Sequence, residues 1–229
     1  MIIGGFQKIS LSDFPGRVSA IVFTRGCGFR CPYCHNPELV DPDNYITPLD
    51  EAKILSFLRS REGRIQGVVI TGGEPTFHDD LKDFIRTVRE IGCEVKLDTN
   101  GSNPALLERI ISLGLVDYVA LDVKAPLRLY SSVARVLVNT GDILRSIRII
   151  IDSGLPHEMR TTYLESLLSL DDMREIGEMV RGCRLLVVQR FKPTKALDPA
   201  MLKQPTPPAH AMEQIRAAID AMGVPCETR

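Results

Sequence analysis

Short runs of β-branched and aliphatic residues alternate with amphipathic segments along the whole chain, and this alternation limits the possible folds most strongly. Six of the runs carry apolar residues on both faces, which predicts fully buried strands. They span 19–24, 67–71, 94–98, 117–123, 159–163 and 185–189, and a less regular seventh candidate spans 224–226. Buried strands separated by helical segments predict a parallel sheet with right-handed crossovers.

Residues typical of helix ends mark the segments between these strands. Thr47, Asn103 and Thr206 each precede a proline, the pattern of an N-cap followed by proline at the first helical position. Glycines fall where the helices should end, at positions 63, 92, 114, 154, 182 and 223. The proline-rich stretch 192–208 predicts one surface loop. The chain is therefore expected to be a single α/β domain over residues 1–229, either an open doubly wound sheet or a barrel.

Charge and hydropathy exclude several classes of protein. The 28 lysines and arginines nearly balance 29 aspartates and glutamates, without a long run of one sign. Binding to nucleic acid or to an anionic membrane surface needs a concentrated basic field, so neither is expected. No stretch approaches the ~20 apolar residues of a membrane span, and the N-terminus lacks the pattern of a signal peptide. We therefore expect a cytoplasmic protein.

Polar residues gather after the predicted strands rather than before them. Segment 25–34 follows the first strand, Gly72, Gly73 and Glu74 follow the second, and Thr99 follows the third. Lys124 follows the fourth strand, while Arg160 and Gln189 lie late in the fifth and sixth. Because the carboxyl ends of parallel strands form the functional rim of α/β folds, these residues predict one site at one edge of the sheet.

Three of the six cysteines crowd into this rim, as Cys27-x3-Cys31-x2-Cys34. Three thiolates on one short loop suit an iron–sulfur cluster and would leave one iron without a protein ligand. A structural zinc ion with His35 as fourth ligand, or unliganded thiols, are the alternatives. The remaining cysteines, Cys93, Cys183 and Cys226, show no paired spacing, so a single cluster is expected.

Several ordered motifs together resemble those of the radical S-adenosylmethionine (SAM) enzymes, and among these the glycyl-radical-enzyme activases. The similarity to anaerobic ribonucleoside-triphosphate reductase activating proteins extends over nearly the whole chain. The segments that carry it are Gln7–Arg17, Cys27–Cys34, Thr71–Pro75, Leu97–Gly101, Leu121–Lys124, Arg160–Thr162 and Gln189–Pro193. The resemblance implies a radical SAM core, a partial (βα)6 TIM-like barrel of parallel strands, with a cluster-binding loop at 25–36.

The same resemblance implies the cofactors and their central ligands. Cys27, Cys31 and Cys34 would hold a [4Fe–4S] cluster, and the amine and carboxylate of SAM would chelate the open iron. Reductive cleavage would then give methionine and a 5′-deoxyadenosyl radical. Gly72 and Gly73 would let the backbone approach SAM closely, and Glu74 would bind its ammonium group. The alternatives are a tight strand-to-helix turn for the glycines and a helix N-terminal acid for Glu74.

Other rim residues match family positions around the ligand. Asp98, Thr99 and Asp122 would surround the SAM carboxylate and ribose, and Lys124 and Arg160 would bring positive charge to that carboxylate. Ordinary Asp–Lys or Asp–Arg ion pairs are the structural alternative.

Three further residues complete the candidate site. Tyr33 and His35 would contact SAM through their backbones, Tyr33 at the adenine, and Gln189 is a candidate for the adenine or ribose. Loop packing for Tyr33 and a satisfied polar strand end for Gln189 are the alternatives. Asp13 matches a motif position but is followed by Phe14 where glycine is commoner, so a plain Pro-Gly turn is its default interpretation.

By resemblance, the expected function is that of an activase that takes a hydrogen atom from a backbone glycine of anaerobic ribonucleotide reductase. The implied electron donor is of the flavodoxin or ferredoxin type. One alternative is a radical SAM enzyme acting on another glycyl radical enzyme, such as pyruvate formate-lyase, or on a small substrate. The other is a zinc-stabilised binding module.

Overall fold

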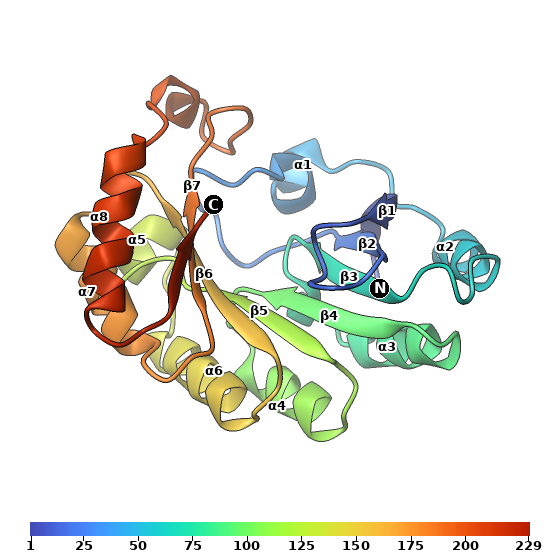
Figure 1. Ribbon diagram of the computed structural model, residues 1–229. Coiled ribbons are helices and arrows are strands. Elements are labelled where there is room, and N and C mark those ends of the chain that lie inside the picture. Colours follow the sequence, from blue (N-terminus) through green and yellow to red (C-terminus); the bar gives the residue numbers. More distant parts are fainter.

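A computed structural model describes all 229 residues as one curved sheet of eight strands in the order β1 to β8 (Figure 1). The strands are β1 Ile3–Ser10, β2 Ser19–Thr24, β3 Gly67–Gly72, β4 Glu94–Thr99, β5 Tyr118–Asp122, β6 His157–Tyr163, β7 Leu186–Arg190 and β8 Cys226–Thr228. From β2 to β8 every neighbouring pair is parallel. All six predicted strands and the seventh candidate are present.

The strand order decides between the two architectures that the sequence left open. A doubly wound sheet reverses its order at a switch point, whereas here each strand lies beside its sequence neighbours. The first and last strands do not pair with each other, so the barrel is open at one side. This confirms the partial TIM-like barrel.

β1 is the strand that the sequence analysis missed. It runs antiparallel to β2, and its register shifts twice, between Ile3 and Gly5 and between Gln7 and Ser10. Its second half, Gln7 to Ile9, is exposed, so it lacks the buried apolar run that identified the other strands.

Helices cover the outer, convex side of the sheet, as Figure 1 shows for α3, α4, α6, α7 and α8. The helices are α1 Pro37–Val40, α2 Glu51–Arg59, α3 Leu81–Glu90, α4 Pro104–Ser112, α5 Tyr130–Ala134, α6 Thr140–Asp152, α7 Leu170–Met179 and α8 Ala209–Asp220. All six glycines predicted to end helices adopt positive φ angles of 62° to 95°. None of the helices is both long and apolar enough to cross a membrane.

Of the three predicted helix starts, only Asn103 is correct: its side chain caps α4 by accepting from the Leu106 amide. α2 begins after Asp50, not Thr47, because the Asp50 carboxylate accepts from the Ala52 amide. α8 begins after Pro208 instead of Thr206, since a proline disfavours helical geometry in the residue before it.

The predicted surface loop 192–208 is more ordered than its composition suggests. It contains the 3₁₀ turn η4, Pro199–Lys203, and the Met201 side chain in that turn is buried. The loop therefore packs on the domain, and Lys195 also binds Glu38 in α1 with an Nζ to Oε2 distance of 2.6 Å.

The main core lies between the sheet and its helices. The predicted stripe of α3 is buried there, including Leu81, Phe84 and Val88, as are Met212 and Ile219 of α8. A smaller apolar group formed by Phe14, Ile21 and Val69 packs separately. Ile21 and Val69 of this group face the inner side of the barrel, where they line the same cavity as the polar strand ends.

Leu97, in the middle of β4 and fully buried, provides a test of this core. We expect Leu97→Ala to lower the free energy of unfolding by about 2–5 kcal/mol, because it removes buried methyl groups and leaves a cavity. Leu113→Ala, at a position 49% exposed, is the matched control and should cost less than about 0.5 kcal/mol. Urea denaturation followed by circular dichroism measures both; equal losses would contradict this packing.

Candidate active site

A cavity of about 420 Å³ lies at the carboxyl ends of the strands, on the inner side of the open barrel. It falls within the size range of small-molecule sites. Every residue predicted for the site lines this cavity: Cys27, Cys31, Tyr33, Cys34, His35, Gly72, Gly73, Glu74, Asp98, Thr99, Asp122, Lys124, Arg160 and Gln189. The sequence therefore predicted which side chains meet, although their individual roles stay predictions.

The cysteine loop is fixed by backbone hydrogen bonds to other segments of the chain. The Gly26 amide donates to Leu39 (2.7 Å), and the Gly26 carbonyl accepts from Glu74 (2.7 Å). On the side away from β3, the Arg30 amide donates to Ala134 (2.8 Å), and the Pro32 carbonyl accepts from Asp198 (2.9 Å). The loop is thus held at several points before any ligand is considered.

An ion pair reinforces the contact between Asp198 and Pro32. Arg135 binds the Asp198 carboxylate with an Nη2 to Oδ2 distance of 2.6 Å. Arg135 is also the only non-glycine residue with a positive φ, 53°. A residue with a side chain rarely adopts this conformation. The turn after α5 therefore carries backbone strain at Arg135, the residue that binds Asp198.

The three loop cysteines are free thiols on the wall of the cavity. Burial raises the pKa of Cys27 to about 12 and of Cys31 to about 11, and it raises the pKa of Cys34 as well. Thiolate, not thiol, is the metal ligand, so a metal that binds here must displace protons.

The alternative zinc site with His35 finds no support in the position of this side chain. The His35 Nε2 atom lies 3.1 Å from the Lys192 carbonyl, and its ring stacks on Phe191 with centroids 5.5 Å apart. No group of three or more Cys, His, Asp and Glu side chains converges closely enough to hold one ion. Three soft ligands on one loop that line the same cavity suit an iron–sulfur cluster, in which each would bind a different iron and one iron would stay open.

Two glycines at the end of β3 allow a close approach of backbone to backbone, Gly72 to the end of β2 and Gly73 to the cysteine loop. Gly72 has φ 113°, and a Cβ there would lie 2.5 Å from the Thr24 amide nitrogen. A Cβ on Gly73 would lie 2.2 Å from the Gly26 carbonyl oxygen. Backbone therefore packs directly on backbone, as the tight-turn alternative requires.

Glu74 is buried, with only 2% of its surface exposed, and its carboxylate accepts four hydrogen bonds. Oε1 takes the Thr76 amide and hydroxyl and the Thr99 hydroxyl, the latter two at 2.6 Å. Oε2 takes only the Asn100 amide, also at 2.6 Å. Burial raises the pKa of Glu74, against the lowering effect of these bonds. Glu74 caps the turn η2, Pro75–Phe77, and lines the cavity, and Oε2, which accepts from one donor, keeps a free lone pair.

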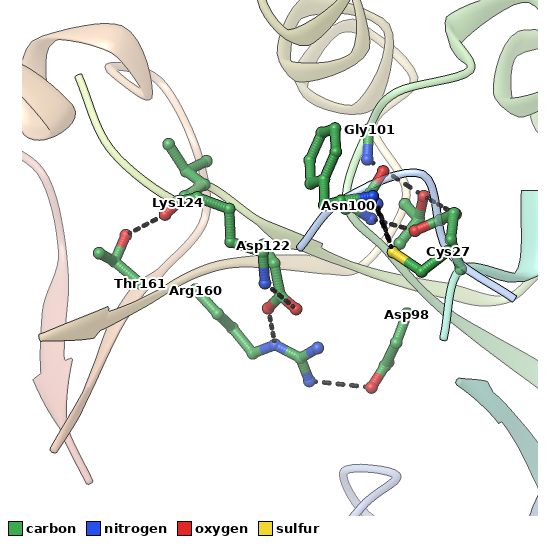
Figure 2. A network of polar contacts seen from close by, with 12 residues as sticks. Cys27, Asp98, Asn100, Gly101, Asp122, Lys124, Arg160 and Thr161 are labelled. Carbon is green, nitrogen blue, oxygen red and sulfur yellow. Dashed lines mark hydrogen bonds and ion pairs between the residues drawn. The ribbon is translucent and has the colours of Figure 1, made fainter. Parts of the chain in front are cut away.

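Lys124, Asp122, Arg160 and Asp98 form a chain of ion pairs, with Arg160 between the two carboxylates (Figure 2). Arg160 Nε lies 2.8 Å from Asp122 Oδ1, and Nη1 lies 2.9 Å from Asp98 Oδ2. Lys124 Nζ lies 3.1 Å from Asp122 Oδ2. The ion-pair alternative is therefore what these side chains adopt, and their contacts with a ligand stay predictions.

The charges of this chain hold one another in the ionised state. Burial disfavours the charged form of Asp122, but Arg160 and Lys124 outweigh it and keep its pKa well below the ordinary value. Asp122 in turn keeps the pKa of both cations raised despite their burial. The wall of the cavity therefore keeps a fixed pattern of alternating charge.

Two residues of this region were not selected from the sequence. Asn100 donates its amide to Glu74, and its side chain lies 3.6 Å from the Cys27 sulfur. Its position directly after a strand was the available signal. Lys96, 1% exposed, extends the ion-pair chain through Asp98 at 2.6 Å. It lies in mid-strand, where nothing in the sequence pattern distinguishes it.

The remaining candidates lie at the cavity wall with fewer contacts. Tyr33 is 5% exposed, and its buried hydroxyl has no hydrogen-bond partner. Gln189 lies on β7, in register with Thr162, which also lines the cavity. Asp13 accepts a hydrogen bond from Ser10 and reaches the cavity from the turn after β1.

Gly73 gives a direct test of how the cysteine loop is held. Gly73→Ala should displace the loop from the end of β3 and reduce the iron and sulfide bound after anaerobic reconstitution, because the clash is with backbone. Gly28→Ala is the control within the loop, since a Cβ at Gly28 meets no atom within 4 Å. If both variants bind as much iron as the unaltered protein, the loop does not depend on this contact.

The comparisons with known proteins agree with the motifs. The model of the radical SAM superfamily matches residues 21–181, more than half of the chain. A protein of Methanocaldococcus jannaschii, named as a candidate glycyl-radical enzyme activating enzyme, is 31% identical over 93% of this chain and 90% of its own length. The pyruvate formate-lyase-activating enzyme of Streptococcus mutans is 28% identical over 83% of this chain and 75% of its own.

A solved structure shows the same fold. Streptococcus suis SuiB, bound to its precursor peptide SuiA, superposes with a TM-score of 0.70 over 91% of this chain. This chain spans about half of SuiB (48%), and at 14% identity the likeness concerns the fold alone. The chain belongs to the radical SAM superfamily, whose enzymes use a [4Fe–4S] cluster together with S-adenosylmethionine.

Proposed function

We propose that this enzyme activates a glycyl radical enzyme by removing a hydrogen atom from a backbone glycine of its partner. The observation that carries the proposal is that one cavity, in a barrel open at one side, joins the three-cysteine loop to the polar ends of the strands. The names of the relatives from Methanocaldococcus jannaschii and Streptococcus mutans support the same activity.

In this proposal Cys27, Cys31 and Cys34 hold the cluster. When bound, the cluster supplies one electron that cleaves SAM, and the nucleoside fragment takes the hydrogen atom from the partner's glycine. Asn100 donates toward the Cys27 sulfur, and such hydrogen bonds tune the reduction potential of a cluster.

The other side chains of the cavity orient SAM. The free lone pair on Glu74 Oε2 is suited to the ammonium group, and the fixed charges of Lys124 and Arg160 are suited to the carboxylate. Because Thr99 and Asn100 hold Glu74 in place, its carboxylate needs no rearrangement when SAM binds. Tyr33 has a buried hydroxyl without a partner, which a polar group of a ligand or a water can satisfy.

A protein substrate fits the shape of the site better than a small molecule does. The barrel is open at the side, where a loop of another protein can reach the cavity. Glycine suits the reaction because its Cα radical is delocalised between the adjacent amide groups and no side chain blocks access. We propose anaerobic ribonucleotide reductase as the partner, on the strength of the motifs that extend beyond the cysteine loop.

Pyruvate formate-lyase is the second candidate partner, favoured by the similarity to the Streptococcus mutans enzyme. The proposed electron donor is a flavodoxin or ferredoxin. The enzyme, reconstituted under anaerobic conditions, should be mixed with SAM, a reductant and each candidate partner carrying deuterated glycine. We expect deuterium in the 5′-deoxyadenosine and a glycyl radical signal in electron paramagnetic resonance with the true partner only. Cleavage of SAM without transfer from either protein would contradict the activase function.

Replacing a loop cysteine should separate the cluster from the fold. Cys31→Ala is expected to reduce bound iron and SAM cleavage to background while circular dichroism stays unchanged. Cys93→Ala is the matched control, because Cys93 is equally buried (5% against 6% exposed) but lies away from the cavity. It should retain full iron content and activity. Reductive SAM cleavage by Cys31→Ala would disprove the ligand assignment.

A further inference from the structure

β1 leaves one backbone edge of the sheet without a partner strand. Its inner edge pairs with β2, but on the outer side only Ile3 forms a bridge, to Leu49. From Gly5 to Ser10 no strand covers this outer side. Unpaired strand edges can take up an extended segment of another chain, and natural proteins usually shield them.

A second cavity, of about 330 Å³, lies beside this edge. It is lined by Lys8, Ile9, Phe57, Arg61, Arg64 and Ile65. The ammonium of Lys8 and the guanidinium of Arg61 lie over the Phe57 ring, 5.7 Å and 5.6 Å from its centre. The site therefore combines an apolar floor with three cations at its margin, in a protein whose net charge is −1.

The cations at this margin are not neutralised by the protein. Lys8, Arg61 and Arg64 are exposed, and none of them forms an ion pair, whereas Arg17 is bound to Glu94 at 2.9 Å. Exposed apolar side chains continue the surface along the strand, with Ile9 60% and Leu11 78% exposed. Charge complementarity therefore favours a ligand with several carboxylates and apolar groups between them.

At its Ser10 end, which pairs with the start of β2 and so lies opposite the cysteine loop, this edge reaches the active-site cavity. Ser10, the last residue of β1, donates to Asp13, which lines that cavity. β1 also borders the opening of the barrel, because it does not pair with β8 at the other end of the sheet (Figure 1). A segment added along β1 would be delivered to the open side of the barrel.

We propose that the β1 docking surface, defined as the edge Gly5–Ser10 with Lys8, Phe57, Arg61, Arg64 and Ile65, binds an extended acidic segment of the partner enzyme. The segment pairs with the strand edge, places carboxylates against the three cations and an apolar side chain against Phe57. This inference rests on the proposed function, because it assigns how the glycine-bearing protein is held.

Other occupants fit the surface less well. A second copy of this chain would bring the same three cations against themselves in a two-fold contact, which is repulsive. A nucleic acid would need a wider basic field than three cations on a chain with balanced charge.

The test compares a charge-reversed enzyme with the unaltered one on two substrates. The variant Lys8→Glu/Arg61→Glu/Arg64→Glu is assayed for glycyl radical formation on the intact partner, and on a short peptide that contains only the target glycine and its neighbours. We expect the KM for the intact partner to rise at least ~10-fold, with a weaker salt dependence, while the rate on the peptide is unchanged. Arg109→Glu/Arg148→Glu/Arg216→Glu, which reverses three exposed cations on helices, is the control and should match the unaltered enzyme.

Each outcome has a distinct meaning. An unchanged KM for the intact partner would overturn the docking surface and leave the activase function standing. A failure of the unaltered enzyme on both substrates would instead overturn the proposed function. Hydrogen exchange tests the strand pairing: binding of the partner should protect amides between Gly5 and Ser10, and unaltered exchange there would refute strand addition. Self-association of the unaltered enzyme that is lost in the charge-reversed variant would identify a second copy as the occupant and overturn the proposal.

Discussion

The site depends on one buried carboxylate that joins the ends of neighbouring strands. Glu74 follows β3, takes hydrogen bonds from the residues that end β4, and caps its own turn. Its amide also donates to Gly26, so the same residue contacts the cysteine loop. A carboxylate buried without partners would be costly, but here four donors compensate the loss of water. The rim is therefore organised before SAM binds.

The sequence predicted the buried parts of the fold well and the exposed parts poorly. Strands β2, β3, β5 and β7 are apolar over most of their length, a pattern typical of a covered parallel sheet. β1 lacks this pattern because its second half faces solvent, and it was missed. The helix starts at Thr47 and Thr206 were wrong because several nearby residues can act as the N-cap. Asp50 caps α2 in place of Thr47, and α8 begins only after the second of two prolines, Pro208.

The residues of the site could be predicted because the ends of parallel strands lie at one rim. This topology determines which residues lie near one another, but not which side chains bind each other. All predicted site residues do line one cavity. The ion pairs of Arg160 with Asp98 and Asp122 depend on side-chain geometry across three strands, which spacing along the chain does not encode. Lys96 was missed for the same reason: a buried lysine in mid-strand becomes meaningful only once its carboxylate partner is seen.

The support of the cysteine loop by Asp198 has a consequence for biogenesis. The loop lies in the first fifth of the chain, yet Pro32 and the turn at Arg135 are tied to a residue near the other end. During synthesis the N-terminal strands can pair early, but the ribosome must release residue 198 before this side of the loop is braced. Insertion of iron and sulfide is therefore expected as a post-translational event, made on a chain that is nearly complete.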